Sequence, residues 1–358
     1  MDRTVKPNSI EKHDSSADHD STEGLREYLR NYYGKMLKRT EDLSRKACCA
    51  DDTKLQHAET LRLIPGEVKE RNYGCGCSIP QDDLTGLTVL DLGSGAGLDA
   101  FIMARLVGEQ GNVYGVDMTN EQLEVARRNI PEVMNAFGYG LANVEFHEGY
   151  IETADAIPDD SIDLVISDCT VNLSPRKEKV FETIFRVLRT GGEFFLSDIV
   201  ADRRVPEAIA HDPQLIAECL GGALYEHDFL DIIMDAGFGD PRVVVRKLVE
   251  EDVNGYPIRF YSATVRGFKL GRSWDRRCED YGQVAIYRGS CALQPARFVL
   301  DDHHVFEAGC PVRVCRNTAR MLSETRLSQY FEVTSPRKHL GLFDCGSEIE
   351  SSSEQPCC

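Results

Sequence analysis

Short apolar runs alternate with amphipathic segments through the middle of this chain of 358 residues. The runs predict buried strands, and the segments, in which apolar residues recur every three or four positions, predict helices. The expected strands cover 89–91, 113–117, 144–147, 162–168 and 193–199, and the expected helices between them cover 100–107, 119–136 and 175–188. Two further helices, over 207–219 and 227–236, and two further strands, over 243–248 and 259–265, continue the pattern. The alternation predicts an α/β fold with a mostly parallel sheet and helices on both faces.

The segments on either side of this pattern differ in composition. Residues 1–24 are rich in Asp, Ser, His and Glu and are expected to be disordered. Tyrosines and leucines near helical spacing follow, which predicts a helical cap over 25–86 ahead of the sheet region at 87–270. After Gly271 the alternation stops, and strand-like pieces at 284–287 and 297–300 predict a small α+β domain over 271–343, followed by a flexible, cysteine-containing tail over 344–358.

The first predicted strand runs into a glycine-rich turn, Asp91-Leu-Gly-Ser-Gly-Ala-Gly97, and then into a helix. Glycines let the backbone turn sharply and approach a ligand, and the helix that follows presents unpaired N–H groups to it. The second strand ends twenty residues later in a carboxylate, where ribose hydroxyls of a nucleotide-like cofactor are expected. The pattern predicts a Rossmann-like cofactor site that includes Gly93, Ser94, Gly95, Gly97 and Asp117.

Two details favour S-adenosylmethionine over a dinucleotide as the cofactor. The glycine spacing is G-x-G-x-G, and Asp91 ends the strand just before the loop. A carboxylate there would repel a pyrophosphate but suits an ammonium group beside a sulfonium. We also expect four wall residues, each with a purely structural alternative as core, turn cap or packing residue: Tyr73, Met118, Ile151 and Glu152.

Charge and hydropathy restrict the partners. The formal net charge of −18 argues against nucleic acid or an anionic membrane as the main partner, which leaves a small molecule. Residues 1–23 are polar and do not resemble a secretory signal, and no apolar run approaches the length of a membrane span. We therefore expect a cytoplasmic, monomeric protein.

Thirteen cysteines without a signal peptide are expected to be mostly thiols rather than a disulfide scaffold. Cys169 directly follows the strand over 162–168, at the edge of the sheet where ligands bind in open α/β folds. Cys219 precedes a Gly-Gly break that would let the backbone bring its thiol over the same cleft. The alternative for each is a small, buried, apolar residue.

Several motifs together resemble the arsenite S-adenosylmethionine methyltransferase family. They are Tyr73-Gly-Cys-Gly76, the glycine loop, Gly115-Val-Asp-Met118, Gly149-Tyr-Ile-Glu152, Ser167-Asp-Cys-Thr-Val-Asn-Leu173 and Glu218-Cys-Leu-Gly-Gly-Ala-Leu-Tyr225. The resemblance covers about residues 45–265 and implies a class I methyltransferase domain that converts arsenite to mono- and dimethylated species in arsenic detoxification.

The resemblance also implies roles for four cysteines. Cys169 and Cys219 would be the persistent ligands of arsenic(III), with Cys75 or an external thiol as the third. Methyl transfer formally oxidises arsenic, so two electrons must be returned. Cys48 and Cys75 would supply them and be restored by thioredoxin or glutathione, although Cys49 competes with Cys48 for that role.

The chemistry of arsenic suits these residues, and two other interpretations compete with it. Trivalent arsenic is soft and keeps a lone pair, so a few thiolates hold it and the lone pair itself attacks the methyl carbon. No histidine stands in the cleft motifs, whereas an oxygen or nitrogen acceptor would usually need a general base. The first alternative is a methyltransferase of another small molecule. The second is a regulatory protein that binds zinc through Cys48, Cys49, Cys75 and Cys77, whose spacing fits zinc motifs poorly.

Overall fold

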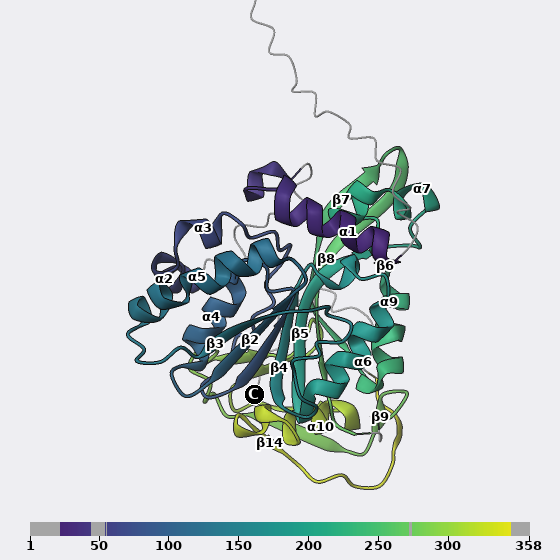
Figure 1. Ribbon diagram of the computed structural model, residues 1–358. Coiled ribbons are helices and arrows are strands. Elements are labelled where there is room, and N and C mark those ends of the chain that lie inside the picture. Colours follow the sequence, from purple (N-terminus) through teal and green to yellow (C-terminus); the bar gives the residue numbers. More distant parts are fainter. Residues whose placement is uncertain (1–21, 44–53, 55, 272–273, 345–358) are drawn as a thin grey trace, which may run out of the picture.

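A single twisted sheet organises the larger part of the molecule (Figure 1). The computed structural model describes residues 22–43, 54, 56–271 and 274–344. Among these residues the main sheet has the strand order β3-β2-β1-β4-β5-β8-β7, and β6 pairs with β5. The strands are β1 (Thr88–Leu92), β2 (Asn112–Asp117), β3 (Val144–Glu148), β4 (Ile162–Asp168), β5 (Leu188–Ala201), β6 (Leu224–Tyr225), β7 (Arg242–Val253) and β8 (Tyr256–Phe268).

Helices cover both faces of this sheet, as the alternating pattern predicts. The helices α4 (Leu98–Val107) and α5 (Asn120–Phe137) cover one face, and α6 (Lys177–Val187) and α9 (Glu226–Ile233) cover the other (Figure 1). Each face of the sheet has its own hydrophobic core, and successive residues of β1 point into different cores. Val89 packs with residues of α4 and α5, and Leu90 packs with residues of α6 and α9. Because side chains alternate along a strand, burial of both of its faces requires an apolar run, which is what β1 has.

The mostly parallel pairing of the sheet is confirmed, its last two strands are antiparallel, and one helix prediction nearby needs correction. The strands β1 to β5 are parallel along the order given, but β8 runs antiparallel to β5, and β7 antiparallel to β8. A tight turn joins β7 to β8 because Asn254 and Gly255 both adopt positive φ, the conformation of a two-residue hairpin.

The single helix expected over 207–219 is instead two short ones, α7 (Glu207–Ala210) and α8 (Pro213–Ala217). Pro213 cannot continue a helix from the preceding turn, and the Asp212 side chain caps the new one.

The N-terminal cap lies over the end of the sheet where β1 and β4 finish. Its helices are α1 (Thr22–Asn31), α2 (Ala58–Leu63) and α3 (Gly66–Lys69), with a π-helical turn over Tyr32–Met36 and a 3₁₀ turn over Thr40–Asp42. Leu29 of α1 packs beside Ala217 and Met118, which come from distant parts of the chain. None of the described helices is both long and apolar enough to cross a bilayer.

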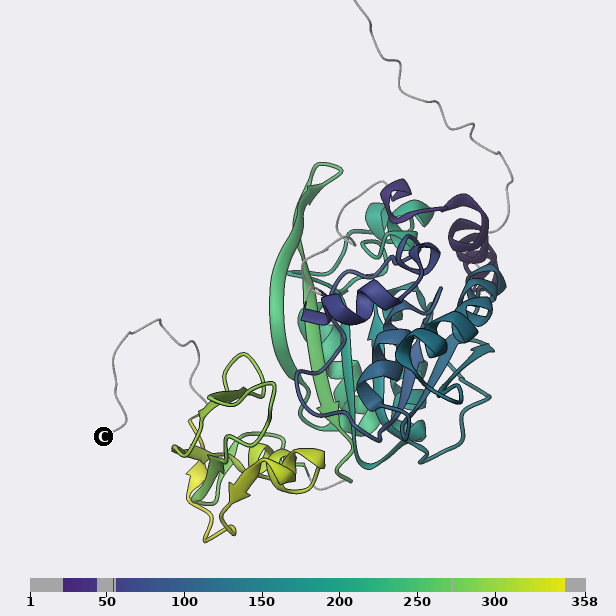
Figure 2. The ribbon, with the colours of Figure 1, turned by 90° about the vertical axis from the view of Figure 1, so that its left-hand side faces the viewer.

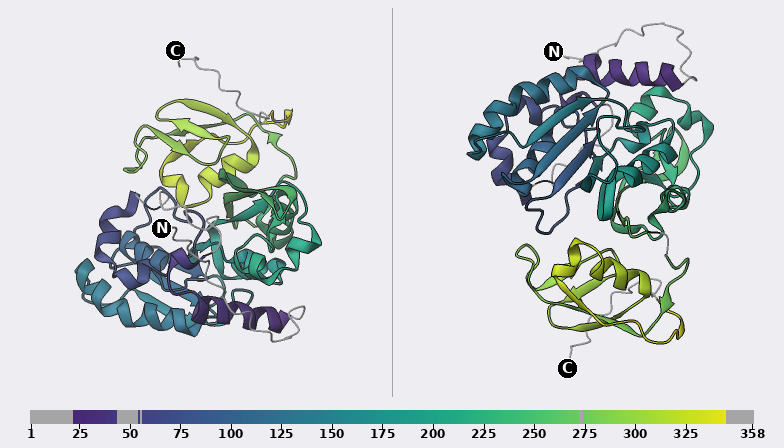
Figure 3. Two further views of the ribbon diagram at one scale, coloured as in Figure 1. Left: turned by 90° about the horizontal axis from the view of Figure 1, so that it is seen from above. Right: turned by 60° about the horizontal axis from the view of Figure 1, so that its bottom comes forward.

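Residues beyond the sheet form a smaller unit with its own core, which lies at the lower left in Figure 2 and is seen from two further sides in Figure 3. Its elements are β9 (Glu279–Asp280), β10 (Gln283–Tyr287), β11 (Arg297–Val299), β12 (Val305–Glu307), β13 (Pro311–Val314), α10 (Arg316–Ser323), a 3₁₀ turn over Arg326–Gln329, β14 (Phe331–Val333) and β15 (Gly341–Leu342). A buried ion network joins the two units: Glu193 of β5 accepts hydrogen bonds from Arg266 (Nε, 2.8 Å) and Arg326 (Nη2, 2.7 Å).

Candidate active site

A cavity opens at the carboxyl ends of β1 and β4, where ligands bind in open α/β sheets. The loop after β1 forms its floor, with Gly93, Ser94 and Gly95 in the lining. Gly93 has φ of 80°, and a Cβ there would lie 2.2 Å from the Thr170 hydroxyl oxygen, so only glycine fits. Gly97, just before α4, is not in the lining of the cavity. A side chain at this position would overlap the ring of Phe146 in β3.

Asp91 gives the cavity the character of a cation site. It lies at the end of β1, is buried, and has one carboxylate oxygen, Oδ2, without a hydrogen-bond partner among the described residues. Burial, followed by the nearby carboxylate of Asp99, raises the pKa of Asp91 well above its ordinary value. A buried, unpartnered carboxylate that lines a cavity suits the ammonium group of S-adenosylmethionine, so the residues present fit this cofactor.

Asp117 shapes the glycine loop as well as lining the cavity. Its Oδ2 accepts the backbone N–H of Gly95 at 2.9 Å, and its Oδ1 accepts that of Thr119 at 2.8 Å. Burial raises its pKa although these N–H groups oppose the shift. The position predicted for ribose recognition is therefore also the one that fixes the loop conformation.

The remaining predicted wall residues, Tyr73, Met118, Ile151 and Glu152, all line the same cavity. Glu152 is buried and accepts hydrogen bonds from Ser174 (2.8 Å) and from Arg26 of α1 (3.1 Å). Because Arg26 itself lines the cavity, the cap helix α1 closes one of its sides.

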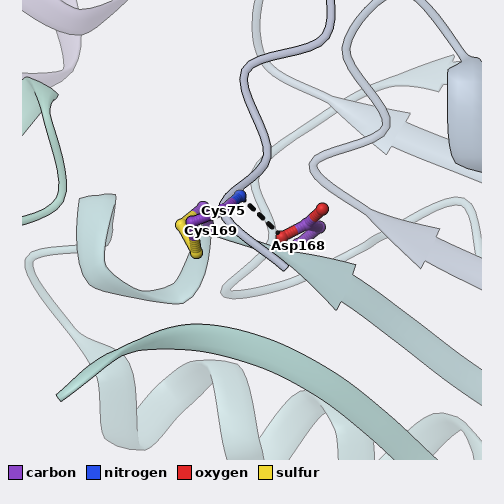
Figure 4. Close-up of side chains that lie close together, drawn as sticks. All are labelled: Cys75, Asp168 and Cys169. Carbon is purple, nitrogen blue, oxygen red and sulfur yellow. Dashed lines mark hydrogen bonds between the residues drawn. A yellow bond between two sulfur atoms is a disulfide. The ribbon is translucent and has the colours of Figure 1, made fainter. Parts of the chain in front are cut away.

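Two of the predicted cysteines are joined at the edge of the cavity. Cys169, which lines the cavity, forms a disulfide with Cys75, and their Cα atoms lie 5.7 Å apart (Figure 4). Asp168 fixes the loop that carries Cys75, because its Oδ1 accepts the N–H group of Cys75 at 3.0 Å (Figure 4). The same oxygen accepts the N–H group of Gly76, also at 3.0 Å. A Cβ at Gly74 would lie 2.0 Å from Asp168 Oδ2. The Gly-Cys-Gly motif therefore has a steric cause.

Cys219 lies close to Cys169 but is not in the lining of the cavity. Its thiol donates a hydrogen bond to the Cys169 carbonyl oxygen at 3.2 Å. The sulfurs of Cys169 and Cys219 and a carboxylate oxygen of Asp198 all lie within 4.8 Å of one another. The Gly-Gly break permits this approach, because a Cβ at Gly222 would lie 2.1 Å from the Asn172 carbonyl oxygen.

Asp198, on β5, is a site residue that sequence reasoning missed. It is 1% exposed, and burial raises its pKa to about 7 although it accepts N–H groups from Asn172 (3.0 Å) and Ile199 (2.8 Å). A carboxyl group whose pKa is near neutrality, beside the Cys219 thiol and the Cys169 sulfur, is suited to exchange protons with thiols at these positions. Its only signal in the sequence was a charged residue inside an otherwise apolar strand.

Lys54 was missed as well. Its ammonium group is 2.7 Å from Asp99 Oδ1 and 3.2 Å from Asp168 Oδ2, in a buried position. Burial opposes its charge, but the two carboxylates outweigh burial and raise its pKa. In turn, burial raises the pKa of Asp168 to about 6 despite Lys54. No periodic pattern around residue 54 indicated this role.

Cys48 and Cys49 lie outside the described residues, as do 1–21 of the predicted N-terminal segment and 345–358 of the tail. The disulfide in the structure joins Cys75 to Cys169, whereas the resemblance implied a redox partnership of Cys75 with Cys48. The disulfide also uses the sulfur of Cys75, which the zinc interpretation requires as a ligand. Cys77 is half-buried, and burial raises the pKa of its thiol to about 11, so it is a poor thiolate ligand.

The fold and the cavity define a methyltransferase of the S-adenosylmethionine-dependent class, and a family model described as a methyltransferase domain matches residues 83–237. The chain belongs to the arsenite methyltransferase family. It is 43% identical to an arsenite methyltransferase of Aquipseudomonas alcaligenes, over 91% of this chain and 96% of the relative, and 37% identical to that of Mus musculus, over 90% and 87%.

A solved structure agrees with this assignment. The arsenic(III) S-adenosylmethionine methyltransferase of Chlamydomonas reinhardtii is 43% identical and superposes with a TM-score of 0.76, covering 80% of this chain and 98% of that one. A second family model, described as a domain of unknown function, matches residues 275–355.

Proposed function

We propose that this protein transfers the methyl group of S-adenosylmethionine to trivalent arsenic held by Cys169 and Cys219. The observation that carries the proposal is the position of Cys169, which lines the cofactor cavity and at the same time lies within 4.8 Å of the Cys219 sulfur and an Asp198 oxygen. Membership of the arsenite methyltransferase family supports the choice of acceptor.

Bound S-adenosylmethionine supplies an electrophilic methyl group on a positively charged sulfur. Asp91 would hold its ammonium group, since this carboxylate is buried and has an oxygen without a hydrogen-bond partner among the described residues. Asp117 holds the glycine loop that would contact the cofactor, and the ion pair of Glu152 with Arg26 would close the cavity against water. Exclusion of water matters because the arsenic–sulfur and sulfonium groups are both open to hydrolysis or competing attack.

Arsenite binding requires thiol protons to leave. When As(OH)₃ reacts with the two thiols, two S–As bonds form, two As–O bonds break, and two water molecules depart, so arsenic stays trivalent. Asp198 is placed to accept a thiol proton and pass it to a departing hydroxide, because its pKa of about 7 lets it exist in both protonation states at neutral pH. Arsenic held by the two thiolates keeps its lone pair, and this lone pair is the nucleophile toward the methyl carbon.

The Cys75–Cys169 disulfide must open before Cys169 can bind arsenic. Opening consumes two electrons and two protons, for which an external dithiol or thiol of the thioredoxin or glutathione type is the reductant. Cys48 or Cys49 would relay the exchange from outside the described residues. Cys75, once reduced, is available as the third arsenic ligand. We further expect a monomer that acts in the reducing cytosol.

The test compares Cys169→Ser and Cys219→Ser with Cys310→Ser, which changes a thiol of the C-terminal unit. Methylated arsenicals formed from arsenite are measured by liquid chromatography with arsenic detection, and cofactor binding is measured by calorimetry in each variant. We expect both Cys169→Ser and Cys219→Ser to bind S-adenosylmethionine but to form no product, and Cys310→Ser to retain activity. Methylation of arsenite by both Cys169→Ser and Cys219→Ser would instead favour the interpretation that another small molecule is the acceptor.

A further inference from the structure

A second pair of thiols lies in the C-terminal unit, outside the cavity described above. Cys278, just before β9, forms a side-chain hydrogen bond with Cys315, at the end of β13. Cys315 is 0% exposed, whereas Cys278 is half-buried. The two residues are far apart in the sequence, so the fold of the C-terminal unit brings the sulfurs together.

Cys315 is held in a position that stabilises a thiolate. It caps the N-terminus of α10, where its sulfur accepts the backbone N–H of Thr318 at 3.5 Å and lies 3.3 Å from the Thr318 hydroxyl oxygen. The hydrogen bond from Cys278, with those from Thr318 and the charge of Arg242, lowers the pKa of Cys315 to about 5 against the effect of burial. The Cys315 sulfur is therefore a nucleophile at neutral pH.

One member of the pair, Cys278, lines a cavity with an acidic wall. Arg242, Asp301 and His304 line the same cavity. The Arg242 guanidinium is already paired with Asp240 (2.7 Å) and Asp301 (3.1 Å), and Asp302 and Glu226 add further carboxylates to the wall. The surplus of negative charge disfavours oxyanions such as phosphate or arsenate but admits a small uncharged molecule. Arsenous acid is uncharged at neutral pH.

We propose that Cys278 and Cys315 form a second binding site for trivalent arsenic. The Cys315 sulfur attacks first, the Cys278 sulfur follows, and both displace hydroxide from As(OH)₃. Two S–As bonds form and two As–O bonds break. One departing hydroxide takes the Cys278 proton and the other takes a proton from solvent, so that both leave as water and arsenic keeps its oxidation state.

The number of donors favours arsenic over a structural metal. Zinc in structural sites needs four ligands, usually cysteine and histidine. Among the described residues, no grouping of three candidate ligand atoms includes Cys278 or Cys315. Trivalent arsenic, by contrast, forms three bonds, and two thiolates with one remaining hydroxide supply them.

The test uses the full chain, reduced and desalted, with arsenite as the probe. In a parent variant with Cys169→Ser and Cys219→Ser, the arsenic retained per chain is measured by atomic mass spectrometry after gel filtration. Adding Cys278→Ser is expected to remove about one arsenic per chain, and adding Cys310→Ser is expected to remove none. Because the parent lacks the two central thiols, the result does not depend on whether methyl transfer is the reaction.

A second measurement avoids substitutions altogether. In the wild-type protein, arsenite is expected to slow alkylation of Cys278 by iodoacetamide at least tenfold, as followed by peptide mass spectrometry. Retention of the parent's arsenic content by the Cys278→Ser variant, or an alkylation rate of Cys278 that arsenite does not change, would overturn the proposal.

Discussion

Asp198→Asn tests the electrostatic description of the thiol site. The carboxyl group is buried, and its pKa is raised from 3.8 to about 7, chiefly by desolvation. Because the folded protein holds this proton more tightly than the unfolded chain, the stability that the group contributes is present at low pH and is lost as the pH rises toward 7. Asparagine does not titrate, so the variant lacks this loss.

The size of the effect follows from the shift. Each pKa unit corresponds to about 1.4 kcal/mol, and the folded carboxyl is only half deprotonated at pH 7. Between pH 5 and pH 7 the wild type should therefore lose about 2 kcal/mol more of its free energy of unfolding than the variant. Part of the offset between the two proteins at any one pH comes from the N–H groups of Asn172 and Ile199, which asparagine cannot both satisfy. The change in the free energy of unfolding with pH can be compared between the two proteins without that offset, because the offset is the same at every pH.

The assay is urea denaturation followed by circular dichroism at pH 5, 6, 7 and 8, with Asp235→Asn, an exposed carboxyl on the helical turn after α9, as the matched control. Stopped-flow binding of arsenite at pH 7 is the second readout, and there we expect the Asp198→Asn variant to bind at least tenfold more slowly. Parallel stability curves for wild type and Asp198→Asn would refute the raised pKa. Unchanged arsenite binding would refute the role in proton transfer.

Two further substitutions test the supports of the site. Gly74→Ala places a Cβ 2.0 Å from an oxygen of Asp168, so we expect a loss of about 2 kcal/mol in the free energy of unfolding and weaker cofactor binding by calorimetry, whereas Gly66→Ala, with open space around its Cβ, should change neither. Glu193→Gln leaves its buried arginine partners without their shared carboxylate, and a loss of about 3 kcal/mol in denaturant unfolding is expected; a loss under 1 kcal/mol would mean that this network does not stabilise the junction between the units.

Local patterns were sufficient to predict the sheet domain and the cofactor loop. The alternation of apolar runs and helical periodicity located β1 to β5 and their helices, because the central strands β1, β4 and β5 are buried on both faces over most of their apolar runs. The glycine loop was predictable since its conformation depends on residues next to one another in the sequence. The break between α7 and α8 at Pro213 and the hairpin at Asn254-Gly255 also have local signals in the sequence, which our helix and strand predictions did not use.

The parts that were missed depend on contacts between distant segments. Asp198 and Lys54 acquire their roles from burial against residues of other elements, which no periodicity encodes. The pairing of Cys75 with Cys169 requires the loop before β1 to reach the end of β4, and Asp168 holds it there. The helix α10 was not predicted because its sequence is mostly polar and only a few apolar residues mark its buried side.

The most direct test of the central claim is a crystal structure of the reduced protein with arsenite and S-adenosylhomocysteine. The account predicts arsenic bonded to the sulfurs of both Cys169 and Cys219, with the thioether of the cofactor product directed at it from the cavity lined by Asp91 and Gly93. Arsenic bound without Cys219, or separated from that cavity by the protein chain, would contradict it.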